Sequence, residues 1–239
     1  MTPLSKKQFE KYDCSIFLNE IGSEGQSKLL NSKILVIGAG GLASSAISYL
    51  MSVGINTLGV VDFDKVNLSN LPRQIIFDEN DLGKLKTDVI KNKFEKKNED
   101  TVLKTYCLKL DKDNASDIFK DYDIVLDCVD NFDTKFVIND TCLKLGIPLV
   151  SAGVSGFKGQ VMMVSKQSKH DFKSLFSTYP KTTEKEKMED RGVFPLAVAL
   201  VSNIQCAEAL KYLLGIGEPL IDEILVIDTI KMNFEKFKI

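Results

Sequence analysis

The sequence has little of what metal sites and crosslinked scaffolds usually require. Among 239 residues there is one histidine, His170, which argues strongly against His-based catalytic triads and multi-histidine metal sites. The five cysteines are widely spaced and form no C-x-x-C pair, which argues against a zinc knuckle and a disulfide framework. Four of them lie in apolar periodic segments, so we expect them to be buried as small hydrophobic side chains: Cys107, Cys128, Cys142 and Cys206.

Charge and hydropathy exclude further classes. The formal net charge is −2, so no broad basic face is available to hold nucleic acid. No apolar run is long enough to cross a membrane, and residues 1–13 lack the apolar core of a signal peptide. We therefore expect a soluble, cytoplasmic protein without nucleic-acid or membrane partners. Arginine is rare: of 31 basic residues only Arg73 and Arg191 are arginines, a choice that favours a phosphate or carboxylate partner, although chance could place two.

Strand and helix patterns alternate over the first two thirds of the chain. Short apolar runs predict five strands, at 33–38, 56–62, 101–108, 122–130 and 147–153. Helical spacing and glycine stops predict helices at 42–54, 82–98 and 132–146. This alternation predicts an α/β fold with a doubly wound, Rossmann-like, mostly parallel sheet. The ligand crevice of such a sheet lies outside the carboxyl ends of its strands.

The last third of the chain has a different pattern. We expect residues 157–165 and 223–239 to form antiparallel strands that extend the sheet. Residues 194–215 predict a long apolar helix, buried in the core or against a second subunit. Residues 181–190 are charged, have no apolar periodicity and are expected to form a mobile loop.

A glycine-rich turn follows the first predicted strand. Gly38, Gly40 and Gly41 would let the backbone approach a phosphate where the next helix presents free N–H groups, with Ala43 replacing the third glycine of the dinucleotide fingerprint. Asp62 ends the second predicted strand, where a carboxylate accepts hydrogen bonds from ribose hydroxyls. The turn alone is a weak signal, and a tight strand–helix connection with a solvated aspartate is the alternative.

The residues after the second strand favour a triphosphate over a nicotinamide dinucleotide. Asn67, Asn70, Arg73 and Gln74 follow within one loop, and Lys86 comes early in the next predicted helix. These donors suit a phosphate chain that is longer and more highly charged than a pyrophosphate. Arg73 offers a bidentate fork and Lys86 a point charge, although Lys86 taken alone could be a surface lysine.

Two acidic residues close the fourth predicted strand. A carboxylate that faces a triphosphate is costly unless it holds a divalent cation, so we expect Asp130 to bind Mg²⁺. Asp127 is the alternative ligand. Because Asp130 begins the loop, we expect Asp127 instead to cap the strand or lie within it.

With these residues assembled, the sequence resembles the ThiF/MoeB/HesA family, bacterial relatives of ubiquitin-activating enzymes, over nearly its whole length. The resemblance rests on EIGSEGQSKLLNSKILVIGAGGL (20–42), VVDFDKVNLSNLPRQ (60–74), DLGKLK (81–86), DCVDNFDTKFVIND (127–140) and VIDTIKMNF (226–234). The second and fourth of these segments are far more specific than the glycine turn.

The resemblance implies an adenylyltransferase. Members use ATP and Mg²⁺ to adenylate the C-terminal glycine of a small ubiquitin-fold sulfur-carrier protein ending in Gly-Gly, with release of pyrophosphate. It implies that Arg73, Lys86 and Asp130 act in catalysis, the last through Mg²⁺. The ATP-binding set that it implies is Gly38, Gly40, Gly41, Asp62, Asp64, Asn67, Asn70, Arg73, Gln74, Lys86 and Asn131. No general base is needed, because a carboxylate is already an anionic nucleophile at neutral pH.

The resemblance also implies an organisation and partners. A homodimer is expected, and the carrier's tail would enter the crevice while its globular part rests on the late strands. Phe157, Val161 and Met163 alternate there, although core packing is the default for each. We expect one adenylation domain over 1–239, with an N-terminal helical segment at 1–30, a nucleotide-binding core at 31–153, and carrier-binding strands, mobile loop and buried helix at 154–239.

The sequence departs from the family pattern at several points. Where many members bind zinc through two C-x-x-C pairs, residues 174–180 have serines, so no zinc is expected. Residues 181–190 lack the cysteine that accepts the carrier in some members, so an external persulfide donor such as a cysteine desulfurase could take it. Lys11 and Cys14 stand where members often have an arginine that reaches a partner's ATP; Lys11 either substitutes or that contribution is lost. Arg191 matches no family position and is expected to be a solvated loop arginine.

Several alternatives stay open at this point. A ThiS-like carrier in thiamine synthesis is the first expectation and a MoaD-like carrier in molybdopterin synthesis the second, and no residue separates the two. An NAD-dependent dehydrogenase is a different class of enzyme, for which Arg73 would be dispensable. A non-catalytic module that binds nucleotide or carrier is the third class, because the thiols used by some members are missing.

Overall fold

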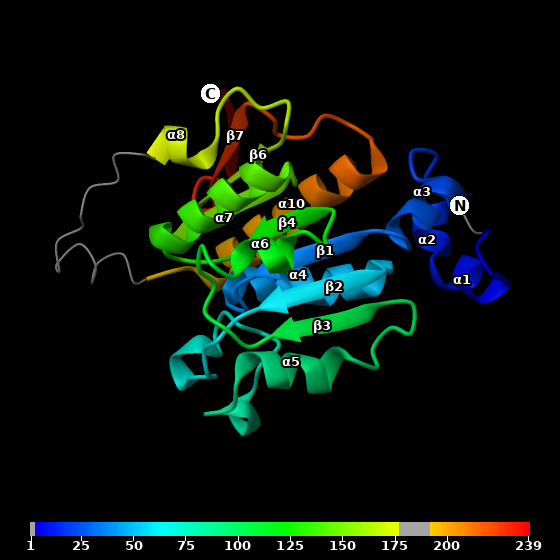
Figure 1. Cartoon of the computed structure of the whole chain (residues 1–239), viewed down its shortest axis with the longest axis horizontal. Helices are drawn as coiled ribbons and strands as arrows, with labels where there is room; N and C mark the ends of the chain where they lie inside the picture. The colour runs from blue at the N-terminus through cyan, green and yellow to red at the C-terminus, as the bar shows by residue number, and fades with distance from the viewer. Residues whose placement is uncertain (1–2, 177–191) are drawn as a thin grey trace.

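One eight-stranded sheet runs through the protein, shown in Figure 1 as a computed structural model that describes residues 3–176 and 192–239. Its strand order is β3-β2-β1-β4-β5-β6-β7-β8. The strands from β3 to β5 in this order pair in parallel, and those from β5 to β8 pair antiparallel, which confirms the predicted fold. The bounds are β1 Lys33–Ile37, β2 Thr57–Val61, β3 Val102–Tyr106, β4 Ile124–Asp127, β5 Leu149–Ser155, β6 Lys158–Val164, β7 Glu223–Asp228 and β8 Asn233–Lys238.

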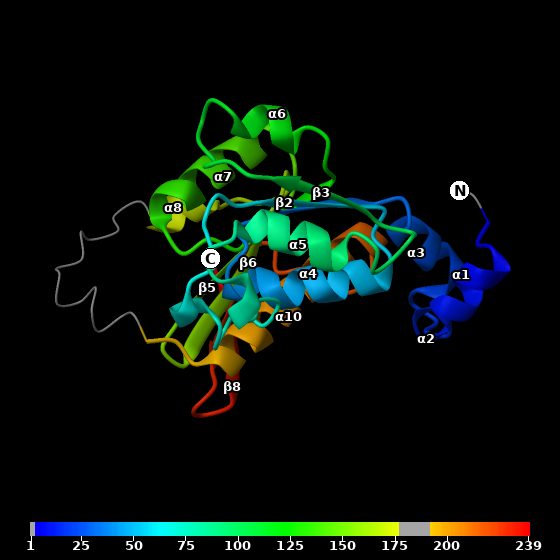
Figure 2. The same cartoon turned by 90° about the horizontal axis from the view of Figure 1, so that it is seen from below.

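Helices cover both faces of the sheet (Figure 2). One layer contains α4 (Gly41–Val53), α5 (Lys86–Phe94) and α10 (Pro195–Leu214), and the other contains α6 (Ala115–Phe119), α7 (Phe132–Leu145) and α8 (Phe172–Phe176). Three further helices, α1 (Lys6–Lys11), α2 (Asp13–Ile16) and α3 (Gly22–Leu29), precede the sheet. Two short 3₁₀ turns, η1 (Leu68–Asn70) and η2 (Glu79–Asp81), lie between β2 and α5.

The central strands read as continuous apolar runs because both of their faces are buried. In β1, Ile34 and Val36 pack in the cluster formed with α4, α5 and α10, whereas Leu35 and Ile37 pack in the cluster formed with α6, α7 and α8. This alternation follows from the two-residue period of a strand. It fixes the register of β1, and therefore the place where the glycine turn leaves the sheet.

The N-terminal helices lie at the opposite end of the molecule from the carboxyl ends of β1 and β2 (Figure 1). They are held to the turn before β3, where Lys11 Nζ lies 2.7 Å from Asp100 Oδ2 and the Tyr12 hydroxyl donates to the same oxygen at 2.8 Å. Burial by itself would raise the pKa of Asp100, but hydrogen bonds from Lys11, Gln8 and Tyr12 outweigh it, and the pKa is lowered. Lys11 is thus a structural anchor in its own chain.

Element bounds differ from the prediction at two places near the crevice. The helix predicted from residue 82 begins at Lys86, because Gly83 has φ +79° and Leu85 is extended. The strand predicted over 122–130 ends at Asp127, so Asp130 lies three residues beyond it, in the loop before α7. The helix α6 was not predicted, since its five residues are too few to show a period.

The helix and strands of the last third of the chain pack only partly as predicted. The long helix α10 buries Val201 and Ala209 against the sheet, while Leu196 is 68% exposed. Val161 and Met163 are core residues, and Phe157 is 45% exposed. The predictions for the loop at 181–190 and for Arg191 lie outside the described residues. None of the helices in the described part of the chain has both the length and the apolar composition needed to span a bilayer.

Candidate functional site

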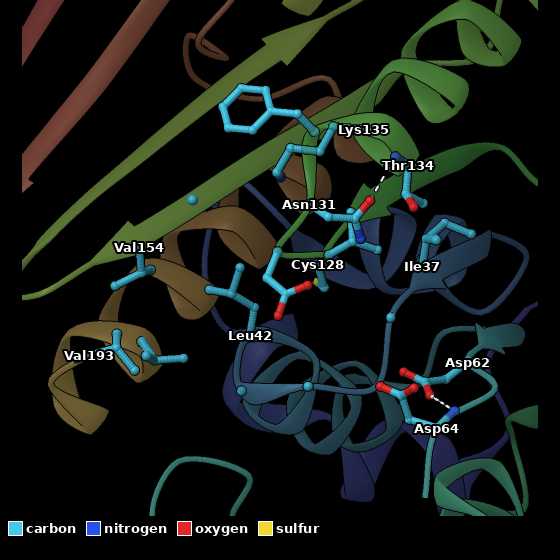
Figure 3. A pocket seen from close by; sticks show the side chains of 18 of the residues that line it. Ile37, Leu42, Asp62, Asp64, Cys128, Asn131, Thr134, Lys135, Val154 and Val193 are labelled. Atoms are coloured by element: carbon cyan, nitrogen blue, oxygen red, sulfur yellow. Dashed lines mark hydrogen bonds between the residues drawn. The ribbon is translucent and has the colours of Figure 1, made fainter. Parts of the chain in front are cut away.

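A cavity of about 840 Å³ opens where β1, β2 and β4 end (Figure 3). This is the point at which the strand order reverses, since β1 pairs with β2 on one side and with β4 on the other. Its volume is within the range of small-molecule sites, about 300–1,000 Å³. Ten residues predicted from the sequence line it: Gly38, Gly40, Gly41, Asp62, Asp64, Arg73, Gln74, Lys86, Asp130 and Asn131.

The glycine turn forms part of one cavity wall, and a side chain would not fit at Gly38 or Gly41. Gly38 has φ +92°, and a Cβ at this position would lie 3.0 Å from the Cys128 carbonyl oxygen. Gly41 begins α4, where a Cβ would lie 2.8 Å from Val198 Cγ1 and 3.3 Å from the Arg73 carbonyl oxygen. The turn therefore brings bare backbone and the N-terminus of a 13-residue helix to the cavity, a combination that binds anions.

Asp62 lies at the end of β2 and is fixed by backbone donors on both sides. Its Oδ2 accepts from the Ala39 N–H at 2.6 Å, and its Oδ1 accepts from the Asp64 N–H at 2.7 Å (Figure 3). An ionised carboxylate offers about four lone-pair positions, so capacity for ligand hydroxyls remains after these two bonds. Asp62 thus has free acceptor positions at the cavity, and its contact with a ribose stays a prediction.

Two cationic side chains reach the cavity from different segments. Lys86 is the first residue of α5 and its side chain is 6% exposed, with Nζ 3.2 Å from Asp64 Oδ2. The alternative of a surface lysine is therefore wrong. Arg73 donates from Nη1 to the Ser69 carbonyl oxygen at 2.9 Å, which leaves further guanidinium donors for a ligand.

Gln74 is a buried amide at the same wall. Within the described residues its Oε1 has no hydrogen-bond partner, although the residue is only 3% exposed. Leaving a buried amide oxygen without a partner costs about 1–3 kcal/mol, and a ligand in the cavity would supply the missing hydrogen bond. Gln74 thus supports a polar ligand in this cavity.

Asp127 and Asp130 have different environments, which decides between them. Asp127 is 1% exposed, pairs with Lys135 Nζ at 2.7 Å and accepts from Ser151 Oγ at 2.7 Å, so it lies within β4 as an internal ion-pair partner. Asp130 is exposed at the cavity. The next residue, Asn131, caps α7 by accepting from the Thr134 N–H at 2.9 Å. Of these two carboxylates, Asp130 is the one accessible from the cavity, and its role as the metal ligand stays a prediction.

Asn67 and Asn70 are not among the residues that line the cavity. The Asn70 side chain accepts from the Asn67 N–H at 3.2 Å, and the Asn67 amide donates to the Lys65 carbonyl oxygen at 3.4 Å. Short polar side chains often cap turns in this way instead of reaching a ligand. These bonds hold the η1 turn, and the ligand contact of the two asparagines stays a prediction.

The prediction missed several lining residues. Lys135 lines the cavity and is buried, although its sequence context, one turn into a helix, is that of a surface lysine. One sequence feature could have identified Lys135: in DNFDTK it follows the predicted metal ligand Asp130 by five residues. The apolar wall, formed by Leu108, Leu110, Val129 and Phe132, carries no local sequence signal.

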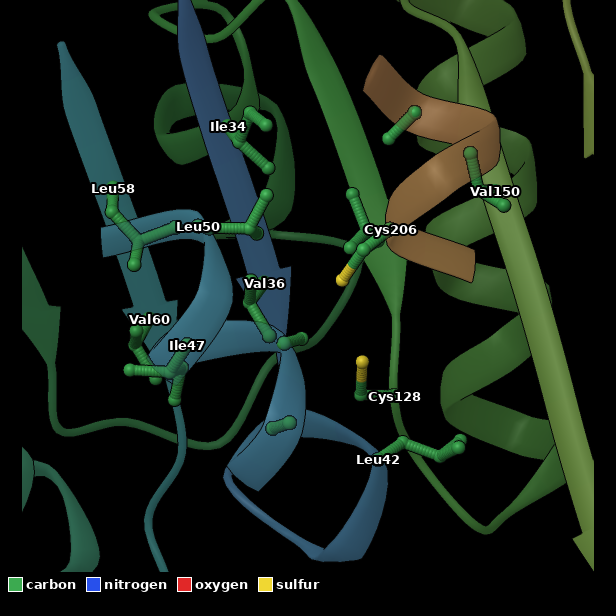
Figure 4. Packing of buried hydrophobic residues seen from close by; sticks show 14 of the residues in the cluster. Ile34, Val36, Leu42, Ile47, Leu50, Leu58, Val60, Cys128, Val150 and Cys206 are labelled. Atoms are coloured by element: carbon green, nitrogen blue, oxygen red, sulfur yellow. The ribbon is translucent and has the colours of Figure 1, made fainter. Parts of the chain in front are cut away.

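The thiols are separated into a buried and an exposed group. Cys128, Cys142 and Cys206 are buried as predicted, and Figure 4 shows Cys128 and Cys206 in the packed core. Burial raises the pKa of Cys128 and Cys142, and that of Cys206 to about 12. The prediction for Cys107 is wrong: it is exposed, because it follows β3, an edge strand with no fully buried residue.

A magnesium ion that arrives with a nucleotide fits the residues present. Within residues 3–176 and 192–239, no cluster of three or more His, Cys, Asp or Glu side chains could hold a metal ion unaided. Mg²⁺ usually takes one or two carboxylates together with substrate phosphates and water, and Asp130 is an exposed carboxylate in the cavity lining. The segments behind the predictions on zinc and on an enzyme thiol, 174–180 and 181–190, lie partly or wholly outside the described residues.

The doubly wound sheet, the glycine turn and the two cationic side chains at the switch point, Arg73 and Lys86, define a nucleotide-binding α/β protein. Residues 12–239 match the ThiF family, and the chain belongs to this family. This confirms the family resemblance and the enzyme class, that of the adenylyltransferases.

Named relatives cover almost the whole chain. It is 34% identical over 240 residues to the sulfur carrier protein adenylyltransferase of Thermus thermophilus, covering 98% of this chain and 89% of that protein. It is 37% identical over 238 residues to a probable molybdopterin-synthase adenylyltransferase of Gracilaria tenuistipitata, covering 99% of this chain and 66% of that protein. It spans 61% of the probable adenylyltransferase/sulfurtransferase MoeZ of Mycobacterium tuberculosis, with 32% identity.

Solved structures share the fold. The complex of E. coli MccB with MccA-N7isoASN has a TM-score of 0.84 at 22% identity, covering 98% of this chain and 72% of that chain. E. coli MccB with ATP has a TM-score of 0.78 at 20% identity, covering 98% and 79%. At these identities the likeness is one of fold.

Proposed function

We propose that the protein uses ATP and Mg²⁺ to adenylate the C-terminal glycine of a small ubiquitin-fold sulfur-carrier protein, with release of pyrophosphate. A ThiS-like carrier is the first candidate and a MoaD-like carrier the alternative. The observation that carries the proposal is the meeting of Gly41, Asp62, Arg73, Lys86 and Asp130 in one cavity. The names of the relatives, which include both a sulfur carrier protein and a molybdopterin-synthase adenylyltransferase, support the substrate class.

The cavity offers binding groups for the ribose, the phosphates and the metal ion of Mg²⁺-bound ATP. Asp62, whose oxygens are oriented by two backbone donors, would accept hydrogen bonds from the ribose. The backbone at Gly41 and the N-terminus of α4 would lie against the phosphates. Asp130 would hold Mg²⁺, which when bound neutralises part of the triphosphate charge.

The chemistry needs positioning and charge stabilisation more than proton transfer. A carboxylate oxygen of the carrier's terminal glycine attacks the α-phosphorus, and a new P–O bond forms. The bond between the α-phosphorus and the oxygen that bridges to the β-phosphate breaks, and pyrophosphate leaves with the electron pair. Arg73 and Lys86 would stabilise the negative charge that develops on the phosphoryl oxygens and the leaving group.

Three of the five thiols are buried, and burial raises the pKa of each. Few described cysteines are therefore suited to accept the activated carrier covalently. We therefore propose that the acyl adenylate passes to an external persulfide donor. A homodimer is the assembly that we propose. Because Lys11 is paired with Asp100 in its own chain, a contribution of Lys11 to a partner's site would require this pair to open.

The test is ATP–pyrophosphate exchange with purified ThiS-like and MoaD-like carriers, each assayed with wild type, Asp130→Ala and Asp133→Ala. Asp133 is an exposed carboxylate on α7 outside the cavity lining, so it is the matched control. We expect exchange that depends on one carrier, is lost in Asp130→Ala and is kept in Asp133→Ala. ATP binding without exchange for any carrier would instead favour a non-catalytic module.

A further inference from the structure

Lys135 and Asp127 form a buried ion pair at the wall of the cavity. Lys135 Nζ lies 2.7 Å from Asp127 Oδ2, and the two side chains are 7% and 1% exposed. Burying two charges carries a desolvation penalty, and a well-packed apolar pair of similar volume is often equally stable or more so. A contribution to fold stability therefore explains this ion pair poorly, and a role in the site explains it better.

The pair holds both ends of the loop that carries Asp130. Asp127 is the last residue of β4 and Lys135 is in the first turn of α7, so residues 128–134 run between the two members of the pair. The loop is braced inside as well: Asp127 Oδ1 accepts from the Val129 N–H at 3.2 Å, and Asn131 Oδ1 accepts from the Thr134 N–H at 2.9 Å.

The same pair is bonded to elements outside the loop. Lys135 Nζ donates to the Ala152 carbonyl oxygen at 2.8 Å, and Ser151 Oγ donates to Asp127 Oδ2 at 2.7 Å, both from β5. From α10, Gln205 Nε2 donates to the Asp127 carbonyl oxygen at 2.9 Å. The loop thus has a fixed position relative to the parallel sheet, and Figure 3 shows Lys135, Thr134 and Asn131 along this wall of the cavity.

We propose that Lys135 and Asp127 are positioning residues whose ion pair holds the 128–134 loop so that Asp130 presents its carboxylate to Mg²⁺-bound ATP. Neither residue contacts the nucleotide in this arrangement; both act through Asp130. The inference rests on the proposed function, because it takes Asp130 as the metal ligand. It goes beyond that function by assigning a role to a lysine that would otherwise pass for a structural residue.

The first test measures nucleotide binding rather than turnover. Isothermal titration of ATP at a series of Mg²⁺ concentrations is compared for wild type, Lys135→Met and Lys144→Met. Lys144 is an exposed lysine on the same helix, which makes it the matched control. We expect Lys135→Met to need about tenfold more Mg²⁺ for half-maximal binding, the lower end of the effect of residues that orient metal ligands. We expect Lys144→Met to match wild type. An unchanged Mg²⁺ requirement in folded Lys135→Met would overturn the proposal.

Because Lys135→Met leaves Asp127 as an unpaired buried charge, this variant alone could simply unfold. The double variant Asp127→Asn/Lys135→Met removes both charges with little change of volume and is expected to keep a melting temperature near that of wild type. A purely structural pair predicts wild-type Mg²⁺ dependence in this variant. The positioning role predicts that the tenfold requirement persists although the fold is restored.

A double-mutant cycle shows whether the effect runs through Asp130. In an Asp130→Ala background, Lys135→Met is expected to change ATP affinity less than about twofold, because the group that it positions is already gone. A full effect in that background would mean that Lys135 contacts the nucleotide itself and would overturn the proposal. The exchange activity of the wild type separates the two claims. If the wild type shows no exchange, the proposed function fails. If it shows exchange and the Asp127→Asn/Lys135→Met variant has the same Mg²⁺ dependence as the wild type, only the positioning role is refuted.

Discussion

Replacing Lys86 with methionine removes one cation from the cavity while keeping most of the volume of its side chain. Its ammonium is buried at the wall, 3.2 Å from Asp64 Oδ2, and would face the phosphates of a bound nucleotide. A unit charge about 4 Å from a developing negative charge contributes about 4 kcal/mol at an effective dielectric constant near 20. Loss of one preorganised donor in enzymes typically lowers the rate about 10²–10³-fold, which corresponds to a similar energy. We therefore expect Lys86→Met to lower carrier-dependent ATP–pyrophosphate exchange about 10²–10³-fold.

The fold of Lys86→Met should survive. Asp64, the partner of Lys86, is 53% exposed, so the carboxylate left behind is solvated and the pair contributes less than about 1 kcal/mol to stability. For a chain of this length, a loss of 1 kcal/mol lowers the melting temperature by at most about 4 °C.

The matched control for Lys86→Met is Lys93→Met on the same helix. Lys93 binds Asp78 Oδ2 at 2.6 Å and also contacts Asp81, away from the cavity. Lys93→Met should lower the melting temperature and keep the exchange rate. Lys86→Met that retains more than a tenth of the wild-type rate would refute the role given to this lysine.

Three further predictions concern the turn, the thiols and the N-terminal anchor. Gly41→Ala should weaken ATP binding and lower the melting temperature, because its methyl group would meet α10 at 2.8 Å; calorimetry with and without ATP measures both effects. At pH 8 a thiol reagent should label Cys14 and Cys107 rapidly in the native protein and the three buried thiols only after unfolding; rapid native labelling of a third thiol would contradict the burial. Asp100→Asn should lower the melting temperature at neutral pH. Because the pKa of Asp100 is lowered in the fold, its contribution to stability is fully present above the usual carboxylate pKa and is lost as the pH falls through the lowered pKa. The gap between wild type and variant should therefore begin to narrow below about pH 4 and close only at a pH below the lowered pKa of Asp100. A gap that is independent of pH would contradict the pairing with Lys11.

The sequence predicted those parts of the site that have local signals. The glycine turn, Asp62 at the end of a strand and Asp130 at the start of a loop all follow from their position relative to an apolar run. Parallel strands place their carboxyl ends along one edge, so these residues meet in the cavity without any knowledge of tertiary contacts.

What the sequence did not predict depends on pairs that are distant in the chain or on competing local bonds. Lys135 looks like a helix-surface lysine until β5 is placed beside it, where the Ala152 carbonyl oxygen accepts a hydrogen bond from Lys135 Nζ. Asn67 and Asn70 suit a ligand by type, but their side chains bond to the turn that contains them. Cys107 follows an apolar run that forms an edge strand, and edge position is a property of the whole sheet.

The most direct test of the central claim is a crystal structure of the protein with ATP and Mg²⁺. The cavity should hold the nucleotide with its ribose at Asp62 and its phosphates at the Gly41 turn, the guanidinium of Arg73 and the ammonium of Lys86 should both contact the phosphates, and Asp130 should contact the metal. A nucleotide bound with Arg73 and Lys86 directed away from its phosphates, or a metal bound without Asp130, would contradict the account.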